Sequence, residues 1–176
     1  VYNEAISLYP IDIVTINLLR PLLNRLGQRW QEREAGIAEE HFFSAFLRNK
    51  IGARMHHASS RSQGSRLLLA CLPGEFHELA SLLFGMSVMS RGYRLLFLGA
   101  DVPVEQILKV AKATQIQGIM LTAINVVVRG QLLRELSDSA SQLSIPVMLG
   151  GSAYALAGVP EDSGLVVLGN EYRAAL

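Results

Sequence analysis

The sequence predicts an α/β protein in two parts, a helical bundle followed by a parallel sheet with helices on its faces. Half of the 176 residues are hydrophobic, and a chain of this length can bury about 70% of its unfolded surface, which allows a large core. Up to residue 58 the apolar residues recur at helical spacing. From residue 66 on, short apolar runs alternate with amphipathic segments, and such alternation is typical of parallel strands joined by crossover helices.

The first 58 residues carry the pattern of the helical bundle. Residues 1–9 are predicted to be the end of one helix, which Pro10 closes. The next helix is predicted from Ile11 to about Arg33, and Gly36 then interrupts the pattern. Apolar residues at helical spacing in this helix are Leu19, Leu22, Leu23, Leu26 and Trp30. Those of the following helix, each four positions after the last, are Phe43, Leu47, Ile51 and Met55.

A small, polar segment without pattern, residues 59–65, is predicted to be a linker. Five apolar runs after it are predicted to be strands: Leu67–Leu72, Leu95–Leu98, Ile119–Leu121, Val147–Leu149 and Leu165–Leu168. The helices between them cover about residues 78–91, 104–115, 127–142 and 153–158. Five strands alternating with helices favour the flavodoxin-like (Rossmann-like) strand order 2-1-3-4-5.

This strand order predicts where a ligand would bind. Open parallel sheets bind ligands outside the carboxyl ends of their strands, at the point where the winding direction reverses. Strands one, three and four are neighbours in this order, so the loops that follow them should meet at one edge of the sheet. These loops are residues 73–78, 122–125 and 150–152.

Composition and motifs exclude several kinds of protein. The formal net charge of +1 leaves no large basic surface for DNA. A single cysteine, Cys71, excludes an internal disulfide and a cysteine-built zinc site. The loop 73–78 has neither the glycine pattern of a dinucleotide site nor a P-loop.

The longest apolar run has six residues, whereas a membrane-spanning helix needs ~18. Since no signal peptide opens the chain, we expect a cytoplasmic protein without membrane contact.

An imidazole and a carboxylate stand two residues apart in the first of the three loops, at His77 and Glu75. A carboxylate that accepts one ring N–H leaves the other ring nitrogen as a more basic metal ligand. Taken alone, His77 could equally cap the following helix or make a structural hydrogen bond. Thr122 could be an ordinary strand-end residue. Gly150-Gly151 could form a tight turn, although paired glycines also let a ligand approach the backbone closely.

Taken together, the three loops resemble the cobalamin-binding (B12-binding) domain family. The family pattern is D/E-x-H-x-x-G after strand one, S/T-x-L/I/V after strand three and G-G after strand four. The corresponding segments here are Glu75–Ala80, Thr122–Ile124 and Gly150-Gly151. The resemblance implies that His77 is the lower axial cobalt ligand. It also implies that the nucleotide tail of the cofactor enters the sheet edge, past Thr122, Ile124, Gly150 and Gly151. Ala80 departs from the pattern, and its extra methyl group could crowd the tail.

A second motif lies in the helical bundle, where Trp30 is followed after nine residues by Glu40 and His41. A helical hairpin would bring these three side chains to the same end. Alternatively, Trp30 is a core anchor, and Glu40 and His41 are first-turn residues favoured by the helix dipole. The W-x9-E-H pattern before a cobalamin-binding domain resembles the sensory half of the MerR-family B12-dependent photoreceptor regulators, the CarH/LitR-like group.

This second resemblance implies that the bundle caps the upper face of the corrin, with Trp30 beside the upper ligand. The expected cofactor is adenosylcobalamin, with methylcobalamin as the alternative. We expect a non-enzymatic, light-responsive sensory module that forms a homo-oligomer and reaches DNA only through a domain absent from this chain. The chain would then be a fragment or a stand-alone regulator. Some light-sensing members have a histidine directly after the tryptophan, whereas this chain has Gln31.

Two other functions fit the same motifs. The first is a corrinoid-shuttling protein of a methyltransferase system, which has the same two-part architecture and the same lower-ligand pattern. Trp30 with Glu40 and His41 suits a sequestered upper ligand better than a methyl group that must be passed to partners. The second is a regulator that binds other proteins and senses B12 or another chromophore.

Overall fold

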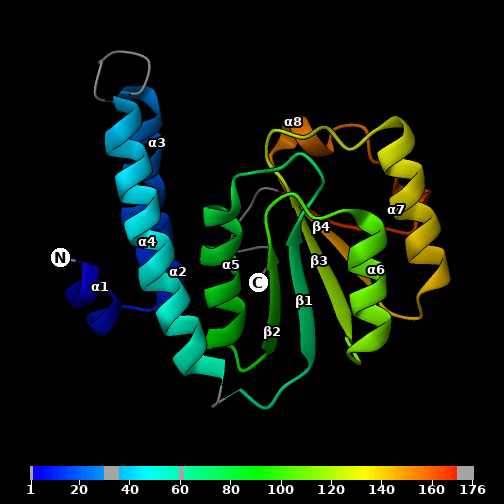
Figure 1. Ribbon diagram of the computed structural model, residues 1–176, viewed down its shortest axis with the longest axis horizontal. Coiled ribbons are helices and arrows are strands. Elements are labelled where there is room, and N and C mark those ends of the chain that lie inside the picture. Colours follow the sequence, from blue (N-terminus) through cyan, green and yellow to red (C-terminus); the bar gives the residue numbers. More distant parts are fainter. Residues whose placement is uncertain (1, 30–35, 60–61, 170–176) are drawn as a thin grey trace.

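The computed structural model describes residues 2–29, 36–59 and 62–169. The helical region comes first in the chain and lies beside the α/β region (Figure 1). Its elements are α1 (Tyr2–Leu8), α2 (Ile11–Val14), the π-helical turn η1 (Thr15–Leu19), α3 (Arg20–Arg29) and α4 (Gly36–Ser59). None of the helices in the described part of the chain has the length and apolarity that a membrane crossing needs.

The α/β region alternates strands and helices as predicted. Its elements are β1 (Arg66–Cys71), α5 (Glu78–Ser90), β2 (Arg94–Gly99), α6 (Val104–Ala113), β3 (Gly118–Ala123), α7 (Gly130–Gln142), β4 (Val147–Gly151), α8 (Ala153–Leu156), the 3-10 turn η2 (Glu161–Ser163) and β5 (Val166–Gly169). All strand pairs are parallel, and their order is β2-β1-β3-β4-β5. The predicted fold class and strand order are therefore confirmed.

The sheet separates two layers of helices (Figure 1). On one face, apolar residues of β1, β3 and β4 pack with residues of α6 and α7, such as Ile107 and Leu136. On the other face, Leu69 and Met120 pack against Val88 of α5. The opposite side of α5 packs against the helical region, where α4 contributes Leu47 and Ile51.

Helix α5 is consequently buried on both sides, which explains why its sequence is apolar all round rather than amphipathic. Its approach to the sheet is close: a Cβ at Gly85 would lie 2.6 Å from a methyl carbon of Leu95 and 3.1 Å from one of Leu69. Helix α5 therefore forms the layer between the sheet and the helical region.

The predicted helix from Ile11 to about Arg33 is continuous from Ile11 to Arg29, but it contains a π-helical segment, Thr15–Leu19, shortly before Pro21. Proline cannot donate a backbone hydrogen bond, and its ring clashes with the carbonyl four residues earlier, here that of Asn17. The π-helical turn directly before α3 widens the helix at this point, as is common at such irregularities. The end of the prediction, after Arg29, falls outside the described residues.

The segment 62–65, within the predicted linker, is held against the start of β2. Gly64 donates its backbone N–H to the Gly92 carbonyl at 3.0 Å, and Arg94 donates to the Ser65 carbonyl at 3.0 Å. Ser59, the first residue of the predicted linker, is the last residue of α4. Residues 62–65 of the predicted linker therefore lie beside the amino end of β2.

Candidate functional site

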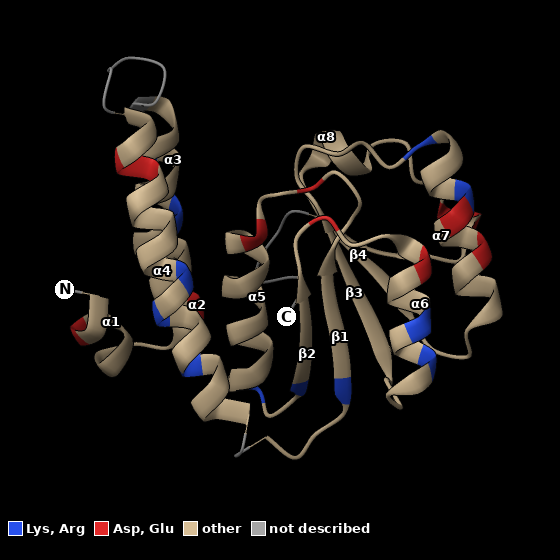
Figure 2. Ribbon diagram, in the orientation of Figure 1, with Lys and Arg blue, Asp and Glu red and all other residues tan. Residues whose placement is uncertain are grey.

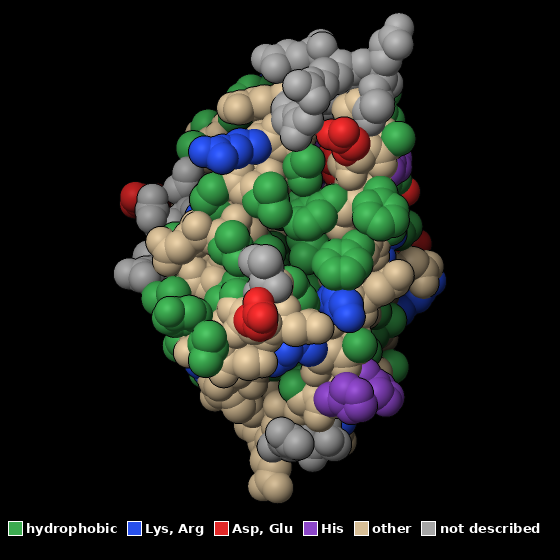
Figure 3. Space-filling model, turned by 90° about the vertical axis from the view of Figure 1, so that its left-hand side faces the viewer, with side chains coloured by type: hydrophobic (Ala, Val, Ile, Leu, Met, Phe, Trp, Pro, Cys, Tyr) green, Lys and Arg blue, Asp and Glu red, His purple; other side chains and the backbone are tan. Residues whose placement is uncertain are grey.

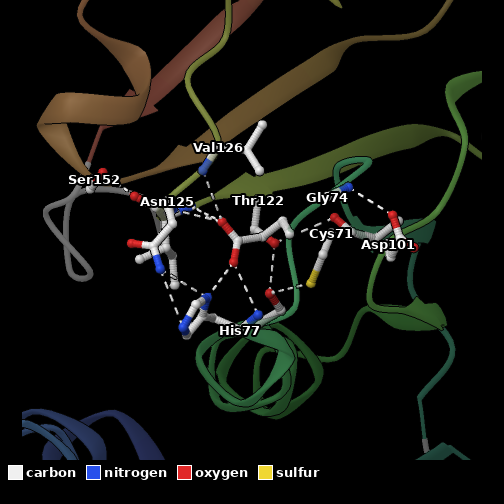
Figure 4. Close-up of polar contacts among 12 residues, drawn as sticks. Cys71, Gly74, His77, Asp101, Thr122, Asn125, Val126 and Ser152 are labelled. Atoms are coloured by element: carbon white, nitrogen blue, oxygen red, sulfur yellow. Dashed lines mark hydrogen bonds and ion pairs between the residues drawn. The ribbon is translucent and has the colours of Figure 1, made fainter. Parts of the chain in front are cut away.

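Three loops meet at the carboxyl edge of the sheet: β1–α5, β3–α7 and β4–α8 (Figure 4). Strand register aligns the ends of these strands, because Cys71 pairs with Thr122, and Thr122 pairs with Gly150. Figure 2 shows acidic residues in the loops at this edge and basic residues at the amino ends of β1 and β2. The segments that carry the three parts of the predicted motif are therefore neighbours.

Glu75 lies at the centre of this edge and is only 1% exposed. Its Oε2 accepts hydrogen bonds from the backbone N–H groups of Ile124 and Asn125, both at 2.7 Å. Its Oε1 accepts the backbone N–H of His77 at 3.0 Å. Burial alone would raise the pKa of this carboxyl, but the N–H groups around it lower the pKa to about 2. Glu75 is thus an ionised carboxylate that ties the β1–α5 loop to the β3–α7 loop.

His77 is held by the same carboxylate, and its side chain is 57% exposed. Its Nδ1 lies 2.6 Å from Glu75 Oε1. Since an ionised carboxylate only accepts hydrogen bonds, Nδ1 must carry the proton, and Nε2 of the neutral ring keeps its lone pair. His77 occupies the N-cap position of α5, but its side chain makes no capping bond. The arrangement has the chemistry of a metal ligand oriented by a carboxylate.

Thr122 turns its hydroxyl toward α5. Thr122 Oγ1 lies 2.6 Å from Ser81 Oγ, and Ser81 Oγ lies 3.3 Å from Cys71 Sγ. Ser81 and Cys71 are both buried, and burial raises the pKa of the Cys71 thiol. Sequence reasoning missed Ser81, although a serine directly after the motif, in an apolar helix, was a usable signal.

The two glycines of β4 have different surroundings. A Cβ at Gly151 would lie 1.7 Å from the carbonyl oxygen of Ala123, so only glycine fits there. A Cβ at Gly150 would meet no atom within 4 Å, so open space lies beside this residue. Next to them, Ser152 donates its hydroxyl to the Ile124 carbonyl at 2.6 Å, which ties the β4–α8 loop to the end of β3.

Asp101, in the β2–α6 loop, is a further residue that the sequence analysis did not select. Its Oδ1 accepts the backbone N–H of Gly74 at 2.7 Å, and its own N–H donates to the Glu75 carbonyl at 3.0 Å. Asp101 has a φ of 51°, in the left-handed region that aspartate tolerates better than most residues. The prediction considered only the loops after strands one, three and four, and so left out this fourth loop.

The bundle motif is only partly within the described residues, since Trp30 and Gln31 lie outside them. Glu40 and His41 are in the first turns of α4, which begins at the same end of the molecule as the carboxyl ends of the strands (Figure 1). Glu40 accepts a hydrogen bond from Ser44 at 2.6 Å. The His41 side chain is 76% exposed, and its Nε2 lies 4.0 Å from Glu40 Oε2. The predicted meeting of the three side chains stays a prediction.

An ion pair joins the two regions beside the site. Arg48 Nε of α4 lies 2.5 Å from Oε1 of Glu78, the residue after His77.

At the opposite edge of the sheet lies a hollow of about 300 Å³, lined by Ser59, Arg66, Arg94, Leu95, Leu96 and Thr114. This hollow is remote from His77 because it is formed at the amino ends of β1 and β2.

Comparison with known proteins identifies a family that the helical region of this chain resembles. Residues 1–54 match the family model described as the B12 binding domain. The resemblance to the cobalamin-binding domain family is confirmed. The matched residues are those of the helical region, whereas the motif around His77 lies in the α/β region.

Two curated relatives are HTH-type transcriptional repressors of Myxococcus xanthus. CarA is 32% identical over 103 residues, which are 58% of this chain and 34% of the repressor. CarH is 26% identical over 159 residues, which are 87% of this chain and 52% of the repressor. The chain thus spans between about a third and about half of the length of these relatives. Methionine synthase of Mycobacterium tuberculosis is 27% identical over 68% of this chain and 10% of the enzyme.

Two solved structures share the fold. The monomethylamine corrinoid protein of Methanosarcina barkeri has a TM-score of 0.64 at 16% identity, and the alignment covers 98% of this chain and 85% of that one. The methanol:cobalamin methyltransferase complex MtaBC of the same organism has a TM-score of 0.54 at 17% identity, with 99% and 69% coverage. At these identities the likeness shows the fold alone.

The residues at the carboxyl edge fit a cobalt corrinoid. The exposed imidazole of His77 has one nitrogen bound to Glu75 and the other with a lone pair, which suits an axial cobalt ligand. The open space beside Gly150 leaves room for a group that approaches the backbone of β4.

Proposed function

We propose that this chain is the cobalamin-binding sensory module of a MerR-family transcriptional regulator. The family match and the similarity to two transcriptional repressors support this function. The observation that carries the cobalamin-binding part of this proposal is the contact between Glu75 and His77 Nδ1, which leaves Nε2 of an exposed imidazole available to a metal. The module has no enzymatic activity of its own, and it reaches DNA through a domain outside this chain.

The two regions have different tasks in this proposal. Residues 66–176 form the cobalamin-binding domain, in which His77 is the cobalt ligand and Glu75 orients it. Thr122, Ile124, Gly150 and Gly151 would hold the nucleotide tail of the cofactor. Residues 1–58 form the cap over the upper face of the corrin, and residues 59–65 link the two.

The upper face of the corrin is the signalling side. Adenosylcobalamin supplies a cobalt–carbon bond that green light breaks. Trp30 would pack beside the adenosyl group, with Glu40 and His41 next to it. Loss of this bulky group would change the packing of the cap and thereby the oligomeric state. Hydrophobic side chains gather on the face of the molecule that Figure 3 shows. Phe42 and Phe46 of α4 are exposed aromatic residues, and such exposed apolar surface supports association with another copy.

The cobalt ligand is tested with the purified chain and adenosylcobalamin in the dark. Wild type should give the visible spectrum of base-off cobalamin with a histidine ligand. His77→Ala should change that spectrum, because the lower ligand is lost, and Glu75→Ala should weaken binding by about 10- to 100-fold. His56→Ala, an exposed histidine in the last turn of α4, is the matched control. An unchanged spectrum and affinity for His77→Ala would reject this assignment.

The upper face and the light response need separate measurements. Trp30→Ala should weaken adenosylcobalamin binding more than hydroxocobalamin binding, because only adenosylcobalamin offers a bulky group to pack against. Size-exclusion chromatography in the dark and after green light should show a change of oligomeric state. An oligomer that is the same in both conditions would exclude light-driven disassembly for this chain.

A corrinoid-shuttling protein is the second candidate function. Similarity to methionine synthase over 68% of this chain favours it. A shuttle must expose its upper ligand to a partner enzyme, so Trp30→Ala should then affect both cobalamin forms equally. Equal losses in the Trp30→Ala experiment would therefore favour the shuttle over the sensor.

A further inference from the structure

Asn125 contacts His77 through its side chain and Glu75 through its backbone. We propose that Asn125 is a positioning residue that fixes the plane of the His77 imidazole. The proposal rests on the proposed function, because that plane determines where Nε2 points when it meets cobalt. Asn125 Nδ2 lies 3.3 Å from His77 Nδ1 and 3.3 Å from His77 Nε2 (Figure 4).

The two equal distances define where the amide lies. An atom equally far from both ring nitrogens at this range cannot lie in the ring plane, because it would overlap the ring carbon between them. The Asn125 amide nitrogen therefore lies over a face of the imidazole. The lone pair of His77 Nε2 points outward in the ring plane, so the amide leaves it free.

His77 needs such a second contact. The hydrogen bond from Nδ1 to Glu75 restrains one atom of the ring, but coupled rotations about the Cα–Cβ and Cβ–Cγ bonds of His77 can keep this bond and still tilt the ring plane. The side chain is 57% exposed, so packing restrains it little. An amide group over one face supplies the missing restraint, with a weak N–H contact to the ring.

The position of Asn125 is itself well determined. Its backbone N–H donates to Glu75 Oε2 at 2.7 Å, so the carboxylate that binds His77 also holds the residue that covers the ring. Ile124, just before it, donates to the same oxygen at 2.7 Å. The ring, the amide and the carboxylate thus form one unit, preorganised on the β3–α7 loop before a cofactor arrives.

Asn125→Ala tests the proposal, with Gln131→Ala as the matched control. Gln131 is an exposed amide at the start of α7, and its side chain contacts Glu135 rather than the site. Neither change removes a backbone bond to Glu75, so both variants should fold with unchanged circular dichroism. Loss of one modest contact should weaken adenosylcobalamin binding by about 2- to 10-fold in Asn125→Ala. Gln131→Ala should bind like wild type.

Nuclear magnetic resonance of the histidine rings, without cofactor, supplies a measurement that does not depend on cobalamin. In Asn125→Ala the His77 ring should keep its proton on Nδ1, because Glu75 is intact, but relaxation should show faster ring motion. Unchanged ring motion, or tighter cobalamin binding, would overturn the proposal; tighter binding would mean that the amide obstructs the metal. If wild type bound no cobalamin, the proposed function would fail, and the ring-motion experiment would still decide the role of Asn125.

Discussion

The helical region and the α/β region prepare their candidate residues in different ways. At the sheet edge, the carboxylate of Glu75 gathers backbone N–H groups from two loops and orients His77. On α4, the contacts of Glu40 with Ser44 and His41 stay within one helix. The difference teaches that the candidate site around His77 depends on the strand topology, which brings two loops together, whereas the described part of the bundle motif depends on a single helix.

The largest effect is expected from the two glycines of β4, which are adjacent and differ in surroundings. Gly151→Ala would place a methyl group 1.7 Å from a backbone oxygen of β3. Since backbone cannot move aside easily, we expect a loss of at least about 3 kcal/mol in the free energy of unfolding. Gly150→Ala should fold normally, because its Cβ meets open space, and should weaken cobalamin binding instead.

Urea unfolding and cobalamin titration of both glycine variants provide the measurement. If Gly150→Ala lost as much stability as Gly151→Ala, the space beside Gly150 would be needed for packing rather than for a ligand. Gly27→Ala, on α3 of the helical region, is the control for a glycine with no neighbour within 4 Å. It should not lower stability, since alanine is favoured over glycine within a helix.

The next effect concerns the charge of Glu75. Its pKa falls from 4.5 to about 2 in the folded protein, which corresponds to a stabilisation of about 3 kcal/mol at pH 7, as an order of magnitude. Because the folded-state pKa is lowered, this stabilisation is present above about pH 4.5 and is lost as the pH falls toward 2. Glu75→Gln should remove it, and should also leave backbone N–H groups without an anionic acceptor.

Unfolding free energies of wild type and Glu75→Gln, measured between pH 7 and pH 3, test this prediction. The difference between the two proteins should shrink as the pH falls. Glu135→Gln, an exposed carboxylate on α7, should show little difference from wild type at either pH. A constant difference between wild type and Glu75→Gln over this range would contradict the lowered pKa.

The smallest effect is expected where the two regions meet. Arg48 is 54% exposed, so water reaches the ion pair from the arginine side, although Glu78 is only 17% exposed. We expect Arg48→Ala to cost about 0.2 to 1 kcal/mol in the free energy of unfolding. The apolar contact of α4 with α5, through Leu47 and Ile51, holds the regions together.

Lys109→Ala is the matched control, because Lys109 pairs with Glu105 within α6, and both side chains are more than half exposed. Its effect should be smaller than that of Arg48→Ala, since Glu78 is the less exposed carboxylate. A loss of 2 kcal/mol or more in Arg48→Ala would mean that electrostatics rather than apolar packing joins the two regions.

The sequence by itself determined the strand order and the edge at which Glu75, His77, Thr122 and the β4 glycines meet. Alternation of apolar runs and helices is a local pattern, and parallel connection then restricts the topology to few choices. The π-helical segment before Pro21 was not predicted, although proline chemistry accounts for it. The alternation of apolar runs and amphipathic segments predicted an amphipathic helix at residues 78–91. Helix α5 is instead apolar all round, because it is buried on both sides.

Only the tertiary structure decided which atoms act together at that edge. The carboxylate of Glu75 binds backbone N–H groups of Ile124 and Asn125, and backbone groups leave no residue-type signal in a sequence. The contacts of Asn125 with His77 and of Arg48 with Glu78 each join segments that lie 30 or more positions apart. Such contacts depend on distances set by packing of the whole molecule, and no periodicity in the chain records them.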